Sequence, residues 1–198
     1  MDQTTIIVIA VVIVVLCIVG FLLMQRRRTE NLQSSFGPEY ERALREKGDK
    51  RKAEAELQER QKRVEKLSIR PLDSGQRQRF TGEWQRIQAE FVDNPENSIR
   101  DADILLQDVM SARGYPVKNF EQVSADISVD HPTVVQHFRA AHDVAARHAH
   151  GEGDTEDLRK AMINYRALFD ELVTDGSESD KETPTQRIDD DAGTRARV

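Results

Sequence analysis

The sequence contains one cysteine, Cys17, among its 198 residues. No disulfide can form within the chain, which excludes the small secreted domains that depend on disulfides for stability. Aromatic residues are also scarce, at 6% of the chain. Wherever they recur at regular spacing, they are therefore strong candidates for a core.

Motifs that would indicate catalysis are absent. The sequence has no G-x-x-x-x-G-K phosphate loop, no G-x-G-x-x-G dinucleotide turn and no G-x-S-x-G nucleophile turn. It therefore predicts no catalytic residue, no cofactor and no small-molecule substrate, and indicates a protein that is not an enzyme.

Five histidines gather in one short segment, and they suggest a metal site at first sight. Their spacings are 6, 5, 6 and 2 residues, whereas two ligands on one helix need a separation of three or four. We therefore predict no metal site, and expect His142 at the edge of the core with Ala145 and Ala149. A response of the histidines to pH stays an open alternative. The five are His131, His137, His142, His148 and His150.

One long apolar run, Ile6–Met24, contains no charged side chain. A helix of this length extends ~28 Å, close to the ~30 Å hydrocarbon core of a bilayer. A buried strand would be shorter, and a cleaved signal peptide would have a basic start and a small-residue cleavage site. We predict an uncleaved transmembrane helix in a lipid bilayer, whose representative positions are Ile6, Ile13, Cys17, Gly20 and Met24.

The basic residues at the end of this run predict its orientation. Arg26, Arg27 and Arg28 follow the run directly, and no Lys or Arg precedes it. Positive flanks remain in the cytoplasm, so the N-terminus is expected outside and the rest of the chain inside. This charge difference is the basis for a cell-membrane, single-pass assignment.

Charge divides the remainder of the chain. Residues 25–70 hold 14 Lys/Arg against 9 Asp/Glu, and residues 71–174 hold 11 against 18. An acidic distal segment argues against nucleic acid as a partner, because phosphate binding needs a basic face. Past Arg28 the basic residues alternate with glutamates, so little lipid binding is expected there.

Helical patterns predict an all-α fold with four parts. Residues 1–25 form the transmembrane anchor, and residues 26–70 form a basic linker and a charged helical stalk, with residues 29–38 as a short connector. Residues 71–174 form a small antiparallel helical bundle, and residues 175–198 form a disordered acidic tail. The stalk carries only a thin apolar stripe of Leu57, Val64 and Leu67, too short to establish a coiled coil.

The bundle has clear apolar faces and helix boundaries. Asp73 with Gln76 predicts a capping box, and Gly114 predicts a left-handed helix end. Asp101 and Asp108 are expected on a solvated face. The side chains predicted to form the core are Trp84, Phe91, Leu106, Phe138, Tyr165 and Phe169.

Several short stretches resemble a family of small uncharacterised bacterial single-pass membrane-anchored helical proteins. They are Phe36-Gly37-Pro38-Glu39-Tyr40, Arg113-Gly114-Tyr115-Pro116, Asp157-Leu158-Arg159 and Tyr165-Arg166-Ala167-Leu168-Phe169. The resemblance covers about residues 33–174. It implies a bacterial source and an anchor–stalk–bundle layout, and it carries over no activity.

Three functional classes follow from these observations. The first is a protein-interaction or scaffold module at the inner face of a bacterial membrane, with an unknown protein partner or self-association. The second is an extracytoplasmic sensor or stress-linked envelope domain with the opposite topology. The third is a metal-binding or enzymatic helical domain, for which a pocket of converging histidines and carboxylates would be the evidence.

Overall fold

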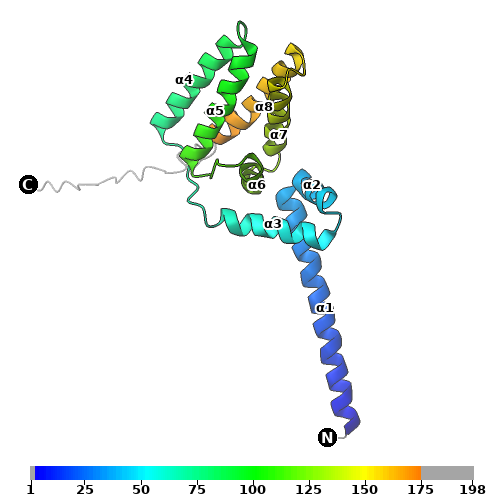
Figure 1. The fold of residues 1–198 in the computed structure, drawn as a ribbon. Helices are drawn as coiled ribbons and strands as arrows, with labels where there is room; N and C mark the ends of the chain where they lie inside the picture. The colour runs from blue at the N-terminus through cyan, green and yellow to red at the C-terminus, as the bar shows by residue number, and fades with distance from the viewer. Residues whose placement is uncertain (1–2, 175–198) are drawn as a thin grey trace, which may run out of the picture.

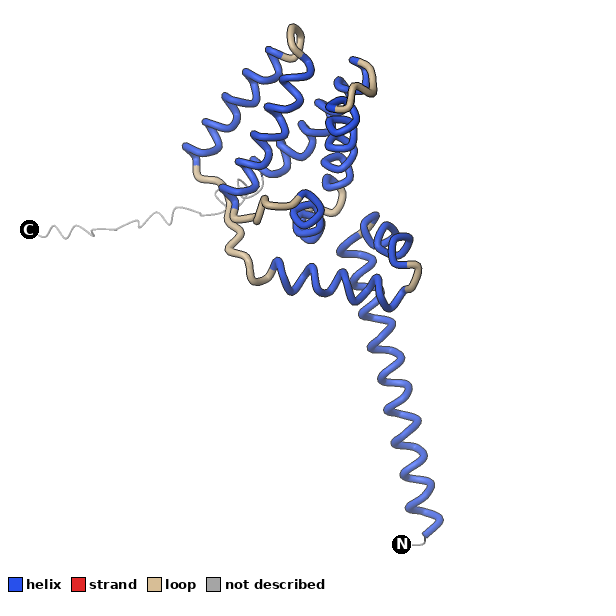
Figure 2. The backbone as a smooth tube through the Cα atoms, in the orientation of Figure 1, coloured by secondary structure: helices blue, strands red, loops and turns tan. Residues whose placement is uncertain are grey.

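The structure, a computed structural model, describes residues 3–174, without the side chains of residues 3–11 and 14. The predicted tail, 175–198, lies outside this description. Within the described residues the protein is all-α, as predicted, with no strand (Figures 1 and 2). The helices are α1 (Gln3–Phe36), α2 (Pro38–Lys47), α3 (Lys50–Val64), α4 (Ser74–Glu90), α5 (Pro95–Arg113), α6 (Phe120–Asp130), α7 (Val134–Ala149) and α8 (Thr155–Thr174).

The first helix runs well beyond the apolar segment. The predicted linker between residues 29 and 38 is wrong, because α1 continues through this segment to Phe36. Gly37 ends it with a positive φ of 46°, and Pro38 begins α2 at a position where a missing N–H costs nothing. The helix break expected at Gly37-Pro38 is therefore present, but the chain before it is helical.

The segment predicted as a stalk is a helical hairpin. Gly48, in the left-handed conformation, ends α2, and the Asp49 side chain accepts a hydrogen bond from the Lys52 N–H at the start of α3. The solvated stalk is thus corrected to two helices, separated at Gly48-Asp49 and folded back on α1. We call α1 from residue 29, α2 and α3 the base. Its core consists of Leu32, Phe36, Tyr40, Ala43, Ala53 and Leu57.

The base forms because its few apolar residues meet only when the chain folds back. Each of its helices is too sparsely apolar to bury a face alone, and their aromatic residues lie next to the Gly37 turn. Tyr40 donates a hydrogen bond to Glu54, 3.0 Å away, and Thr29 donates to the same oxygen at 2.8 Å. Burial, aided by this contact with Glu54, raises the pKa of Tyr40 to about 12.

The remaining five helices form the bundle. Trp84, Leu106, Phe138, Tyr165 and Phe169 are all buried in one core, as predicted. Phe91 packs on that core but is only partly buried. The Asp73–Gln76 capping box and the left-handed Gly114 are confirmed at the ends of α4 and α5.

The bundle is joined to the base through buried charged residues. Arg139 on α7 and Arg60 on α3 both lie against Glu39 on α2, which has no exposed surface. Nearby, Arg63 on α3 donates to buried Asp126 on α6 at 2.7 Å. Figure 1 shows α6 and the ends of α2 and α3 in this junction. A buried charge tolerates little displacement of its partners, so these contacts fix how the bundle sits on the base.

The first helix projects away from the rest of the molecule (Figure 1). Its described apolar side chains from Val12 to Met24 are exposed, with Met24 at 74%. Among the residues that the structure describes, no helix combines the length and the apolarity that a membrane span requires.

Candidate functional site

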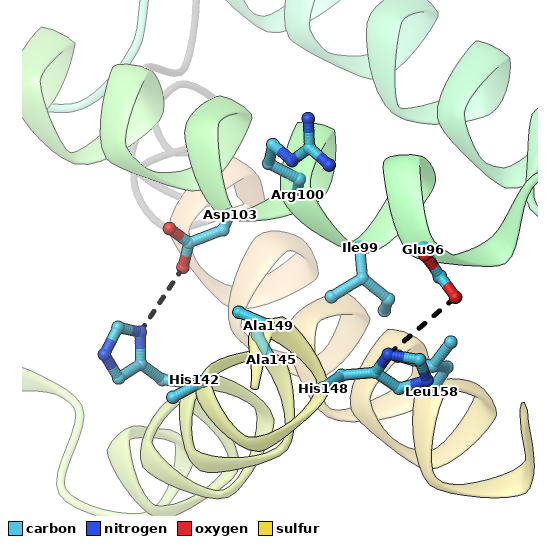
Figure 3. Close-up of a pocket in the computed structure, with 10 residues that line it drawn as sticks. Glu96, Ile99, Arg100, Asp103, His142, Ala145, His148, Ala149 and Leu158 are labelled. Atoms are coloured by element: carbon cyan, nitrogen blue, oxygen red, sulfur yellow. Dashed lines mark ion pairs between the residues drawn. The ribbon is translucent and has the colours of Figure 1, made fainter. Parts of the chain in front are cut away.

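A pocket of about 270 Å³ lies between α5 and α7, with one side formed by α8 (Figure 3). Its middle is apolar, and the alanines of α7 leave space because their side chains are short. Its histidines and carboxylates lie toward the two ends (Figure 3). The lining residues are Glu96, Ile99, Arg100, Asp103, His142, Ala145, Ala146, His148, Ala149 and Leu158.

Asp103 organises one end of the pocket. It accepts hydrogen bonds from Tyr165 Oη at 2.9 Å and from Gln107 Nε2 at 2.7 Å. His142 Nδ1 lies 3.8 Å from the same carboxylate, too far for a direct hydrogen bond but close enough for charge attraction. The His142 ring stacks on Phe120 with a centroid distance of 3.6 Å, which fixes its orientation.

These contacts determine the charge state of the Asp103 carboxylate. Its burial acts to raise the pKa, but the contacts with His142, Tyr165 and Gln107 outweigh burial and leave the pKa below its usual value. The pKa of Tyr165 is raised, first by burial and then by the Asp103 charge and hydrogen bond. At neutral pH this end therefore holds a carboxylate and a neutral phenol.

The other end of the pocket is more open. His148 Nδ1 lies 3.9 Å from Glu96 Oε1, and the Glu96 side chain is mostly exposed. Arg100, also in the lining, lies on α5 between Glu96 and Asp103, closer to Asp103 (Figure 3). This end can exchange its partners with water or with a ligand more easily than the Asp103 end.

The two histidine–carboxylate pairs do not meet at one point. Glu96 and Asp103 are seven residues apart on α5, which corresponds to ~10 Å along a helix. Figure 3 shows the pairs at opposite ends with Ile99, Ala145 and Ala149 between them. Over the described part of the chain, no group of three or more potential ligands could hold a metal ion. The arrangement suits a bound group with an apolar middle better than acid–base chemistry at one atom.

The other histidines lie outside the pocket. Buried His131 has Nδ1 3.1 Å from Glu171 Oε1, and His137 Nδ1 lies 2.9 Å from Asn164 Oδ1. His150 is exposed at the end of α7. The structure thus places His142 with Ala145 and Ala149, as expected, and adds His148 to the same pocket.

The residues predicted to span and orient in a membrane all belong to α1. Ile13, Cys17, Gly20 and Met24 are exposed, while the Ile6 side chain lies outside the described residues. A Cβ added at Gly20 would meet nothing within 4 Å. Arg26, Arg27 and Arg28 are exposed in the turn of α1 directly before the base.

Asp103 was the residue that sequence reasoning missed. The pattern predicts a solvated face for Asp101 and Asp108 and indicates no role for Asp103. A signal was available, because Asp103 follows Ile99 by four residues and precedes Leu106 by three, on the buried side of α5. An acidic residue inside an apolar stripe indicates a buried partner, here Tyr165.

Comparison with known proteins adds no family to this description. No protein-family model, curated protein or solved structure matches the chain.

Proposed function

We propose that this protein is a single-pass membrane-anchored interaction module, whose bundle is held by the base at the inner face of a bacterial membrane. The observation that carries the proposal is α1. This helix contains the uncharged run Ile6–Met24. The described side chains of the run contact solvent rather than the rest of the protein. Exposed apolar surface of this extent is unfavourable in water and favours aggregation, whereas the hydrocarbon core of a bilayer accommodates it.

The junction between base and bundle supports a role in positioning. If the base were only a flexible tether, the bundle could take any orientation, and buried ion pairs at the junction would not be needed. Here Glu39, Arg60 and Arg139 lie within the junction with 6% exposure or less. This arrangement holds the bundle in one orientation above α1, which is useful when a partner must be met at a defined distance from a membrane.

The partner is proposed to bind at the pocket between α5 and α7. At about 270 Å³ the pocket is smaller than the usual 300–1,000 Å³ of a small-molecule site and suits one large side chain of a protein. Large exposed apolar residues on the described bundle are few, namely Val92, Ile104 and Ile163. The contact around this pocket is therefore expected to be mainly polar.

Topology is the first test of the anchor. A compartment-sensitive reporter fused after Val198 should give a cytoplasmic signal in membranes, and a chain lacking residues 1–28 should become soluble. An extracytoplasmic signal would instead favour the envelope-domain alternative, because it would reverse the orientation expected from Arg26–Arg28.

A photo-crosslinking residue placed in the full chain tests the partner site. At exposed Ala146, on the rim of the pocket, it should give a discrete protein adduct in cells. The same residue at exposed Gln85 on α4 is the control and should give none. Equal adducts at both positions would contradict the pocket as the partner site.

A further inference from the structure

Two grooves flank α1 where α3 crosses it, and both begin at the end of the apolar run. Figure 1 shows α3 lying across the upper part of α1. Met24, Arg27 and Lys62 line one groove, of about 820 Å³, which we call the Arg27 groove. Leu22, Arg26 and Arg51 line the other, of about 730 Å³, which we call the Arg26 groove.

The two grooves differ in charge. The Arg27 groove has three cations, Arg27, Arg28 and Lys62, against the single carboxylate of Glu65. The Arg26 groove also has three cations, Arg26, Lys50 and Arg51, but it has three carboxylates: Glu30, Asp49 and Glu54. Only the Arg27 groove therefore has an excess of positive charge.

Ion pairs between these cations and nearby carboxylates increase the difference in charge between the two grooves. In the Arg26 groove, Arg26 lies 3.1 Å from Glu30 and Lys50 lies 3.8 Å from Glu54. In the Arg27 groove, Arg28 donates to the neutral side chain of Gln58, which leaves its charge uncompensated.

The remaining charges of the Arg27 groove are equally open to a ligand. Arg27 makes no ion pair with any residue that the structure describes. Lys62 has only an exposed pair with Glu59, at 3.0 Å, which is easily exchanged for another anion. Asn31 and Ser35, also in the lining, add neutral groups able to donate hydrogen bonds.

The position of the Arg27 groove along α1 indicates which kind of anion it binds. Met24 is the last residue of the apolar run, and Arg28 lies ~6 Å further along the helix. The headgroup layer of a bilayer is ~5–8 Å thick on each side, so these residues would lie within it. Apolar Met24 then faces the acyl chains, while the cations face the phosphates.

We propose that the Arg27 groove binds the phosphate headgroup of an anionic phospholipid. This inference rests on the proposed membrane anchor. It also revises the expectation of little lipid binding beyond Arg28, because Lys62 is far from Arg27 in sequence and joins it only through the fold. A seated lipid would hold α3, and with it the bundle, in one rotation about α1.

The test uses the full chain reconstituted in phosphatidylcholine vesicles with trace spin-labelled lipid. Electron paramagnetic resonance gives the fraction of labelled lipid immobilised by the protein, for phosphatidylglycerol and for phosphatidylcholine. We expect phosphatidylglycerol to be favoured, and the preference to fall about fivefold or more in Arg27→Gln/Lys62→Gln.

The matched control is Arg26→Gln/Arg51→Gln. It removes two exposed cations at the same level on the opposite side of α1, and should keep most of the preference. An equal loss in both variants would mean diffuse attraction between the protein and the surface, and would overturn the proposed site. A wild-type chain with no preference would also overturn it.

Flotation of the same vesicles separates this proposal from the anchor. A chain that floats with the vesicles and shows no preference contradicts only the headgroup site. A chain that fails to float contradicts the anchor and the headgroup site together. Fluorescence of Trp84, the chain's single tryptophan, confirms that each variant is folded.

Discussion

Arg139 on α7 donates a hydrogen bond from Nη1 to Oε1 of Glu39 on α2, a residue 100 positions earlier in the chain. The other oxygen, Oε2, lies 3.6 Å from Nη1 of Arg60 on α3. One buried carboxylate thus lies between a guanidinium group of the base and one of the bundle, and Arg60 has a second carboxylate partner in Glu56 at 2.5 Å. The orientation of one unit on the other depends on this contact.

Replacing this carboxylate should destabilise the protein strongly. Glu39→Gln would leave Arg139 buried without its counter-charge, while Arg60 would keep its ion pair with Glu56. An unpaired buried charge typically costs ~3–5 kcal/mol of unfolding free energy. Chemical denaturation of the full chain in detergent, followed by far-ultraviolet circular dichroism, measures the change. Glu41→Gln, an exposed neighbour on α2, is the control and should change the free energy by less than ~0.5 kcal/mol. Equal effects would contradict the bridging role of Glu39.

The Asp103 carboxylate should make stability depend on pH. Its pKa in the folded protein is below the ordinary value, because its hydrogen bonds and His142 outweigh burial. Its contribution is therefore fully present above the unfolded pKa of ~3.9, and it is lost as the pH falls through the lower folded value.

Asp103→Asn should accordingly be less stable than wild type at pH 7, by ~1–2 kcal/mol, and this difference should shrink below about pH 4. Urea unfolding monitored by Trp84 fluorescence at pH 7, 5 and 3 measures it. Exposed Asp108→Asn serves for comparison and should show no such trend. A deficit for Asp103→Asn that stays constant with pH would argue against an ionised Asp103 as its source.

The stacked pair of Trp84 and Phe169 should dominate the bundle core. Their ring centroids are 4.7 Å apart with an interplanar angle of 12°, and both side chains are buried. Phe169→Ala should lower the unfolding free energy by ~3–5 kcal/mol because it leaves a cavity against the indole. It should also change the Trp84 emission spectrum. Phe169→Leu keeps more of the volume and should lose less; an equal loss would mean that cavity size is not the cause.

Two glycines should respond oppositely to alanine. Gly114 has a φ of +101°, and a Cβ there would lie 2.6 Å from the Ser68 carbonyl oxygen. Gly114→Ala should therefore destabilise by more than ~1 kcal/mol. Gly82 lies within α4 with nothing within 4 Å of an added Cβ, so Gly82→Ala should stabilise by ~0.5–1 kcal/mol. Thermal unfolding of the two variants measures the change in stability of each. A change of the same sign in both variants would contradict this prediction.

Local patterns predicted the bundle well and the base poorly. The spacing of Trp84, Leu106, Phe138 and Phe169 identified buried faces because each helix of the bundle carries a wide apolar stripe. The base has only the thin stripe of Leu57, Val64 and Leu67, so its pattern predicts a solvated helical stalk over residues 39–68. Its core exists only because α1 supplies Leu32 and Phe36 from a segment that was predicted to be a connector.

The contacts in the pocket also fall into those that a local pattern predicts and those that it does not. The position of His142 beside Ala145 followed from the helical period, since all the residues involved lie on α7. The pairing of Asp103 with Tyr165 joins residues 62 positions apart and could not follow from a local pattern. A carboxylate in an apolar stripe indicates a partner, but the partner's identity depends on which helix lies opposite.

The sequence by itself determined the helical class, the helix boundaries at Gly37, Asp73 and Gly114, and the long apolar run, because backbone conformation and side-chain period act over a few residues. The tertiary structure alone decided that Glu39 meets Arg139, that α3 crosses α1, and that Lys62 and Arg27 line one groove. These contacts depend on how whole helices pack, and burial of a charge is favourable only when its distant partner is already in place.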